Sequence, residues 1–389
     1  MRLVYLVAGE ASGDVLGGRL IAALRRLRPR IDIAGIGGAR MAEQGLETLF
    51  PMQDLAVMGL AEILPRVLKL RARLDQAVAD ITMRRPDLVI TIDSPGFTLR
   101  LLRRIGGLGI RRVHYVAPQV WAWRPGRVRH FPGLWDRLLC LLPFEPAFFA
   151  PHGLNPQFVG HPVLDSGAGS GDAARFRARF GLDASARPLI LMPGSRLTET
   201  RRLMPVFRET VARLAPAHPD LVPVLAAAPA IAPELSAVAD SWPIKPVIVT
   251  DPATRYDAFA GASAALTKSG TSTLELALAG VPMAVTYRVN PISAALARRL
   301  ITVPHVAMVN LLAGRALVPE LLQRDCAPDT LAATINTLLA DPASASAQRA
   351  GFAEALALLA APNGATPSEA AAGAALAVLT DDRKEQRDP

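Results

Sequence analysis

Short runs of consecutive apolar residues recur along the chain and alternate with stretches of helical periodicity. Because strands of a parallel sheet are buried on both faces, they read as continuous apolar runs. The pattern predicts an α/β protein with two doubly wound, Rossmann-like domains facing a cleft. The runs are Leu3–Val7, Leu88–Ile92, Val113–Val116 and Leu138–Leu142, then Leu189–Met192, Val222–Ala226, Val247–Val249, Ala264–Thr267 and Met283–Tyr287.

Helical stretches and a break in periodicity set the expected domain limits. Leu16–Leu27 and Val67–Ile81 read as helices between strands. The Gly/Ser-rich segment Asp165–Asp172 lacks periodicity and reads as a linker. We therefore expect a first domain over residues 1–168 and a second over 169–345. Residues 346–389 read as C-terminal helices that pack back toward the first domain and end in a frayed, charged tail.

Composition narrows the classes of protein. Of 389 residues, 51% are hydrophobic, which argues against global disorder, and no apolar run reaches the ~18 residues of a membrane span. The two cysteines, Cys140 and Cys326, form no metal pattern or disulfide framework, so we expect a reducing compartment. We also expect no metal and no cofactor. A net charge of +9 suits polyanionic partners or reflects an Arg-rich composition.

Three motifs at predicted strand ends of the first domain carry candidate chemistry. Gly9–Asp14 precedes a helix and could bind an anion through free amides, or its Ser12 or Asp14 could cap that helix. Asp93 follows a buried strand, where a carboxylate suits a general base or a second cap. His114–Arg124 combines polar and aromatic residues, as in a sugar or phosphate pocket or a core with two tryptophans.

Two further motifs follow strands of the second domain. Gly194 allows close backbone approach, Ser195 offers a hydroxyl, and Arg196 can clamp phosphate with its forked donors. The stretch Lys268–Glu275 opens a helix with small hydroxyl residues, and Glu275 could accept hydrogen bonds from a ribose diol; a capping box formed by Ser272 and Glu275 is the alternative. Neither GxGxxG nor a Walker P-loop is present, which disfavours a dehydrogenase and an ATPase.

The order of these and other motifs resembles the lipid-A-disaccharide synthase family of glycosyltransferases. The resemblance runs from about Leu3 to Arg315 and more loosely to the end. It implies the two-Rossmann architecture called GT-B. It also implies an inverting, metal-independent transfer that joins UDP-2,3-diacylglucosamine to 2,3-diacylglucosamine-1-phosphate in lipopolysaccharide synthesis. The matching segments are GEASGD, LAVMG, IDSPGF, HYVAPQVWAW, LPFEP, FVGHP, MPGSR, SGTSTLELAL, NPISAALARRL and NLLAGR.

The resemblance also implies roles for single residues. Asp93 resembles the general base and Arg196 the diphosphate clamp. The phosphate-contacting helix start corresponds to Ser269, Gly270 and Thr271, and the ribose-binding carboxylate to Glu275. Further substrate-binding candidates are Ser195, Asn310 near the donor, and Ser12 and Gln119 on the acceptor side.

The chain departs from the family pattern at a few positions. Gly96 and Thr98 stand where many members have Asp and Asn, which leaves Asp93 as the one acid of that motif. His305 and Met308-Val309 replace an expected Tyr and Leu-Pro, so the placement of Asn310 is less defined.

Acylated substrates imply a membrane partner. Leu60, Ile63, Leu64, Val67, Leu68, Leu70 and Leu74 fall on one helical arc, with Arg66, Lys69 and Arg73 on the other side, although Arg71 interrupts the apolar arc. A basic amphipathic helix suits the anionic cytoplasmic face of the inner membrane; an ordinary helix packed on the sheet is the alternative. A homodimer is left open. Another UDP-sugar transferase or a sugar-nucleotide epimerase of the same fold is the competing enzyme, and a basic nucleic-acid- or membrane-binding module the competing non-enzyme.

Overall fold

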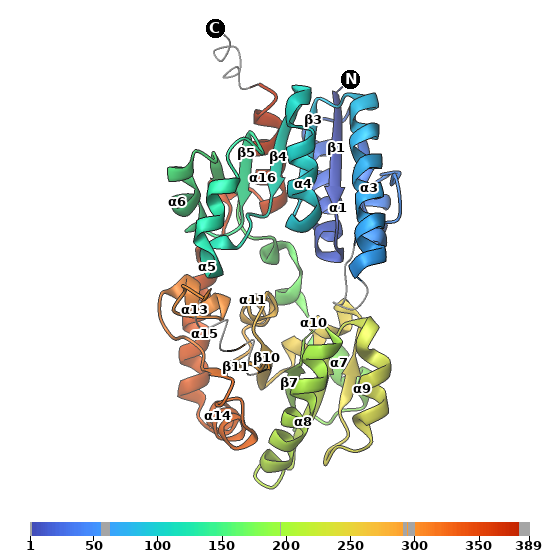
Figure 1. The fold of residues 1–389 in the computed structure, drawn as a ribbon. Coiled ribbons are helices and arrows are strands. Elements are labelled where there is room, and N and C mark those ends of the chain that lie inside the picture. Colours follow the sequence, from blue (N-terminus) through green and yellow to red (C-terminus); the bar gives the residue numbers. More distant parts are fainter. Residues whose placement is uncertain (1, 56–62, 195, 291–293, 295–299, 381–389) are drawn as a thin grey trace. The chain divides into compact units, whose positions relative to one another are not determined.

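The computed structural model describes residues 2–55, 63–194, 196–290, 294 and 300–380. The chain forms two compact units, each built on a parallel six-stranded sheet covered by helices (Figure 1). Unit 1 comprises Met1–Pro162 and Leu359–Pro389, and unit 2 comprises Val163–Leu358. The structure thus divides the chain after Pro162 and Leu358, whereas the sequence placed the divisions after residues 168 and 345.

Unit 1 has the strand order β2-β1-β3-β4-β5-β6, all parallel. Its strands are β1 Arg2–Ala8, β2 Ile31–Ile36, β3 Leu88–Ile92, β4 Arg111–Tyr115, β5 Arg137–Cys140 and β6 Pro156–Phe158. Its helices are α1 Ala11–Leu27, α2 Ala39–Ala42, α3 Ile63–Arg84, α4 Pro95–Arg104, α5 Val120–Trp123, α6 Glu145–Phe149 and α16 Pro367–Ala377.

Unit 2 has the order β12-β11-β10-β7-β8-β9, again parallel. Its strands are β7 Arg187–Met192, β8 Leu221–Ala226, β9 Val247–Val249, β10 Ala264–Lys268, β11 Met283–Tyr287 and β12 Glu320–Leu322. Its helices are α7 Ala173–Phe180, α8 Leu197–Leu214, α9 Ala232–Ala239, α10 Pro252–Ala260, α11 Ser272–Leu278, α13 Met308–Ala313, α14 Pro328–Ala340 and α15 Pro342–Ala357.

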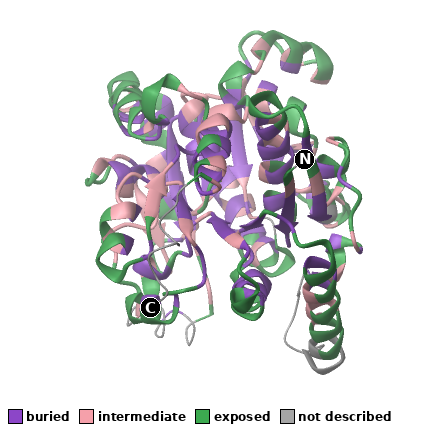
Figure 2. Ribbon diagram, turned by 90° about the horizontal axis from the view of Figure 1, so that it is seen from above, coloured by how far each residue is buried: buried purple, intermediate pink, exposed green. Residues whose placement is uncertain are grey.

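The cores lie where the sheets meet their covering helices. Figure 2 shows buried residues concentrated in the strands and exposed residues on the outer helical faces. All five residues of β3 are buried, as a continuous apolar run in a two-sided sheet requires. The α/β class and the nine predicted strands are confirmed; β2, β6 and β12 were not predicted.

Helix α1 begins at Ala11, five residues before the predicted start. Glycine disfavours a helix by about 1 kcal/mol, which hid this first turn in the sequence. The structure uses the glycines for close packing: a side chain at Gly18 would meet the Arg40 carbonyl oxygen at 2.8 Å. The acidic residue of this turn, Asp14, accepts hydrogen bonds from Gly38, Arg40 and Met41 N–H and so caps the start of α2, not of α1.

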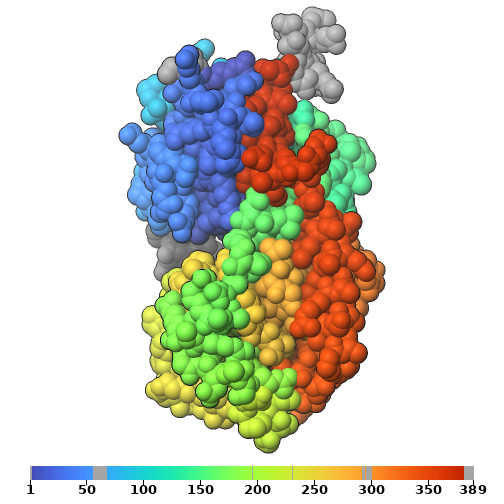
Figure 3. Space-filling view, turned by 180° about the vertical axis from the view of Figure 1, so that it is seen from behind, coloured from blue at the N-terminus to red at the C-terminus, as the bar shows by residue number. Residues whose placement is uncertain are grey.

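Both ends of the chain build unit 1. Helix α16 packs against α1 and contributes Ala371, Ala372 and Ala375 to the core. Figure 3 shows this C-terminal segment lying against the N-terminal elements. Between these two segments of unit 1, the chain forms unit 2, whose first α-helix is α7.

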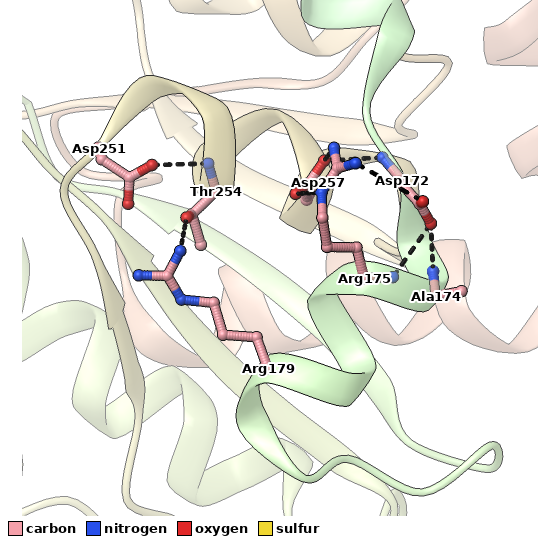
Figure 4. Close-up of polar contacts among 7 residues, drawn as sticks. All are labelled: Asp172, Ala174, Arg175, Arg179, Asp251, Thr254 and Asp257. Atoms are coloured by element: carbon pink, nitrogen blue, oxygen red, sulfur yellow. Dashed lines mark hydrogen bonds and ion pairs between the residues drawn. The ribbon is translucent and has the colours of Figure 1, made fainter.

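Helix α7 is fixed to α10 by an ion pair in which Arg175 donates to Asp257 from Nε at 2.6 Å and from Nη2 (Figure 4). Asp172 caps α7 by accepting from Ala174 and Arg175 N–H, and its own N–H donates to Asp257. The entry of the chain into unit 2 is therefore well anchored.

Candidate functional site

The first-domain candidates gather at the carboxyl edge of the unit 1 sheet. Ser12 follows β1, Asp93 follows β3 and Gln119 follows β4, and these three strands are neighbours. Ser12 and Gln119 are exposed, whereas Asp93 is partly buried. In open parallel sheets, ligands bind beyond this edge.

Asp93 has an unusual backbone. Both Asp93 and Ser94 have a φ of 48°, in the left-handed region that costs non-glycine residues about 1–2 kcal/mol. Asp93 N–H donates to the Tyr115 carbonyl at 2.9 Å, and the Thr98 hydroxyl lies 2.7 Å from the Asp93 carbonyl oxygen. Neighbours thus hold a strained turn at the strand end, a feature that clusters at functional sites.

The electrostatics of Asp93 favour a proton acceptor of more than ordinary basicity. Burial raises the pKa of its carboxyl, against a smaller lowering by the Ser94 N–H. The alternative in which this turn is a simple helix cap is weakened, because the Ser94 side chain makes no capping hydrogen bond to α4. Gly9 contacts this turn: a Cβ there would lie 2.4 Å from the Ser94 hydroxyl.

The aromatic motif after β4 divides between core and surface. Trp121 is buried and donates through Nε1 to Glu145 at 3.1 Å, while Trp123 is 39% exposed with the Arg124 guanidinium over its ring. Glu145 also accepts from the N–H groups of Leu141 and Leu142, yet burial raises the pKa of its carboxyl to about 7. The sequence assigned no role to Glu145, although the segment that contains it, LPFEP, is one of those that resemble the family.

His114 belongs to the interior of unit 1. It is fully buried, its Nδ1 lies 2.7 Å from the Thr91 hydroxyl, and its ring stacks on Trp135 at 5.2 Å. Burial lowers the pKa of His114 to about 3, so the imidazole is neutral at physiological pH. This motif contributes Gln119 and Trp123 to the surface, and His114 to the core.

Unit 2 brings its charged candidates together at the ends of β7 and β10, which are adjacent strands. Arg196 precedes α8, its side chain is 70% exposed, and its Nη1 lies 3.4 Å from Glu199 Oε1. The same Glu199 oxygen is 3.1 Å from Lys268 Nζ, at the end of β10. The sequence assigned no role to Lys268, which shares Glu199 with Arg196. Ser195 lies outside the described residues.

Gly194 is required by this arrangement. Its φ is 120°, and a Cβ at this position would lie 2.5 Å from Glu199 Oε2. Any side chain would therefore displace the carboxylate that holds both cations.

The start of α11 exposes Gly270 and Thr271, whereas Ser269 turns inward and donates to the Val306 carbonyl at 2.7 Å. The capping-box alternative is wrong, because α11 has no side-chain cap. Glu275 instead accepts from the Tyr256 hydroxyl at 2.9 Å and from Arg255 at 3.3 Å, both through Oε1. Tyr256 was missed, since a tyrosine on another helix carries no local signal.

Asn310 is fully buried and its amide is fully used. Its Oδ1 accepts from Leu317 and Val318 N–H, and its Nδ2 donates to the Val318 carbonyl and to Glu320. Glu320 also accepts from Val306 and Ala307 N–H. An amide makes at most about four such bonds, so Asn310 has none left for a ligand. It shapes the segment that Ser269 contacts.

Comparison with known proteins finds relatives that match nearly the whole chain. A family model described as lipid-A-disaccharide synthetase matches residues 4–371. The lipid-A-disaccharide synthase of Gluconobacter oxydans (strain 621H) is 59% identical over 98% of this chain and 91% of its own length. That of Granulibacter bethesdensis is also 59% identical, over 97% of this chain and 98% of its own.

Solved structures share the fold at low identity. UDP-GlcNAc 2-epimerase from Neisseria meningitidis, bound to UDP-GlcNAc, has a TM-score of 0.65 at 10% identity and covers 98% of this chain and 100% of its own. The glycotransferase of kitacinnamycin has a TM-score of 0.62 at 18% identity, over 97% of this chain and 98% of its own. These similarities establish the architecture of glycosyltransferases and epimerases alike.

Proposed function

The chain belongs to the lipid-A-disaccharide synthase family, and on this premise we propose how its two units divide the work of the reaction. It is a glycosyltransferase of lipid A biosynthesis that joins UDP-2,3-diacylglucosamine to 2,3-diacylglucosamine-1-phosphate and releases UDP. The observation that carries this conclusion is the 59% identity to synthases across nearly the full chain.

The test is an assay with both acylated glucosamine substrates, following UDP release and the disaccharide by mass spectrometry. The synthase releases UDP only when the acceptor is present. An epimerase would convert the UDP-sugar without an acceptor, and that result would overturn the assignment.

We infer that unit 1 serves the acceptor. Asp93 takes the proton from the attacking hydroxyl, since an inverting transfer needs a base on the acceptor side. Its burial, its raised pKa and its place at the end of β3 support this role. Ser12 and Gln119, exposed beyond the neighbouring strands, bind the acceptor.

Unit 2 serves the donor. Arg196 stabilises the charge that develops on the departing UDP. Glu199 contacts both Arg196 and Lys268, and Ser195 directly precedes Arg196 in the chain. Gly270 and Thr271 contact phosphate at the start of α11, and the second oxygen of Glu275 accepts from the ribose diol. Ser269 belongs to the same phosphate-contacting helix start, whereas Asn310 shapes this region and does not touch the donor.

Thr98 positions Asp93, because its hydroxyl lies within 3.0 Å of both the Asp93 and Ser94 carbonyl oxygens. Thr98→Val removes this bond with little change of shape, at about 1 kcal/mol of stability. We expect kcat to fall about tenfold as Asp93 loses its alignment, with the KM for the donor unchanged and Thr98→Ser restoring activity.

Thr210→Val is the matched control, since Thr210 is equally buried and its hydroxyl makes the same type of bond, to Val206 at 2.8 Å. Equal losses of melting temperature in both variants with full kcat in Thr98→Val would show that Thr98 has only a structural role.

The start of α3 meets the membrane. Leu68 is 70% exposed on this helix, as an interfacial anchor requires, while Leu70 and Leu74 are half-buried. Lys69 and Arg73 both pair with Asp54, so part of the basic charge is neutralised locally. Leu60 and the side chains of Ile63, Leu64, Arg66 and Val67 lie outside the described residues. No described helix is long and apolar enough to span a bilayer.

Leu68→Ser is expected to weaken binding to vesicles of anionic phospholipid on the order of fivefold, measured by sedimentation, because apolar area is removed from the contact. The control is Met83→Ser, at the other end of the same helix with 76% exposure. If both variants weaken binding equally, the start of α3 has no special role.

A further inference from the structure

Unit 2 contains an apolar groove between α8 and α9 that none of the roles above uses. Its volume is about 510 Å³, within the ~300–1,000 Å³ of typical small-molecule sites. The side chains that line it fall at helical spacing on each helix, so each presents one stripe to the groove. The stripes consist mainly of Thr200, Met204 and Pro205 on α8 and Leu235, Val238 and Trp242 on or just after α9.

The groove is apolar inside and charged at its border. Leu235, Met204 and Trp242 are almost fully buried at its base, while Val238 is 41% exposed at its opening. Arg201 and Glu234 join the two helices across it at 2.8 Å, and Arg208 lines its far end. A lining of this kind suits a hydrocarbon chain more than a polar ligand.

The groove begins one helical turn from Arg196, whose carbonyl oxygen accepts from Thr200 N–H at 3.0 Å. Thr200 lines it and directly follows Glu199, the carboxylate that contacts Arg196 and Lys268. Thr200 is 2% exposed, and its hydroxyl has no hydrogen-bond partner among the described residues. An apolar side chain, Leu197, is 38% exposed on the first turn of α8. The end of the groove near Arg196 therefore presents apolar surface, with the Thr200 hydroxyl buried beneath it.

We propose that this groove binds a fatty acyl chain of the donor substrate. This rests on the proposed function, in which Arg196 holds the donor diphosphate; an acyl chain on the attached sugar then lies within reach of the first turns of α8. The hydrocarbon lies along Met204, Val238 and Trp242. The donor is favoured over the acceptor because the groove adjoins donor residues of the same unit.

Val238→Glu places a carboxylate at the opening without disturbing the base. We expect it to raise the KM for the diacylated donor about tenfold with kcat nearly unchanged, because the contact stabilises ground and transition state equally. UDP-glucosamine without acyl chains should show no difference between this variant and the native chain. The control is Leu358→Glu, the same type of change at a residue of unit 2 with 47% exposure.

Three kinetic outcomes overturn the proposal: an unchanged KM for the acylated donor, an equal rise for the donor without acyl chains, or a rise confined to the acceptor. A second measurement is independent of turnover. Trp242 is the one tryptophan of residues 163–358, so a chain with phenylalanine at the other three tryptophans reports on the groove alone.

A straight-chain fatty acid carrying bromine should quench the fluorescence of Trp242, and Val238→Glu should weaken that quenching about tenfold. Quenching in this chain together with no transferase activity in the native protein would reject the proposed function while supporting the groove. Transferase activity with no quenching, or with quenching equal in both proteins, would reject the groove.

Discussion

Asp93→Asn is expected to lower kcat by about 10²–10⁴-fold while leaving UDP binding intact, because it removes basicity but retains shape and hydrogen bonding. The acceptor hydroxyl is a weak acid, so loss of its proton as the new bond forms needs a positioned acceptor. Asp93 is the one acid of its motif, Ile92–Phe97, so no neighbour in that motif takes over.

The pH dependence gives a second signature of the same role. A base must be deprotonated to act, and burial raises the pKa of Asp93. The activity of the native chain should therefore fall, as pH is lowered, at a pH above the ordinary pKa of an aspartate. The residual activity of Asp93→Asn should lack this limb.

Asp87→Asn is the matched control, at the opposite end of the same strand, where Asp87 accepts from Leu3 N–H at 2.7 Å. UDP affinity is measured by calorimetry and kcat by disaccharide formation. Retained kcat in Asp93→Asn would reject the assignment, since Asn caps a helix as well as Asp does.

Arg196→Ala should lower kcat/KM by about 10²-fold or more, because the guanidinium stabilises charge that appears on UDP as the glycosidic bond breaks. Arg196→Lys should recover little, since an ammonium cannot form the two parallel bonds of the fork. The side chain is largely exposed and paired only loosely with Glu199, so the folded state should tolerate both changes.

Arg213→Ala serves as control on the last turn of the same helix, where the arginine also pairs with a carboxylate, Glu209. Melting temperatures establish that each variant is folded. Near-native kcat/KM in Arg196→Ala would exclude the clamp, and full recovery in Arg196→Lys would reduce the role to a point charge.

The apolar runs predicted the fold well because strands buried on both faces leave a local signature. The three missed strands lack it for physical reasons. β2 contains an exposed Asp32, and β6 and β12 are three-residue strands at sheet edges. Their residues are only partly buried, so neither strand carries a continuous apolar run. The sequence did not predict that α1 starts at Ala11, because its glycines disfavour a helix. These glycines contribute through tertiary packing, which a sequence does not show.

The sequence predicted candidate residues that directly follow a strand. It did not predict the contacts that support these residues. Asp93 and Arg196 stand at strand ends, which periodicity locates. Tyr256, Lys268 and Glu320 act on residues 19, 69 and 10 positions away, respectively, and such pairings are not visible in a sequence. The full use of the Asn310 amide within unit 2 was equally beyond sequence reasoning.

The return of α16 to unit 1 has a consequence for biosynthesis. Unit 2 is one continuous segment and can acquire its whole core as soon as residue 358 leaves the ribosome. Unit 1 cannot, because the alanine face that covers α1 is made only after unit 2. Until then Leu20, Ile21 and Leu24 of α1 lack part of their cover, and chaperones that hold nascent apolar surface have a defined target. A chain terminated after residue 358 should accordingly yield a folded second half and an aggregating first half.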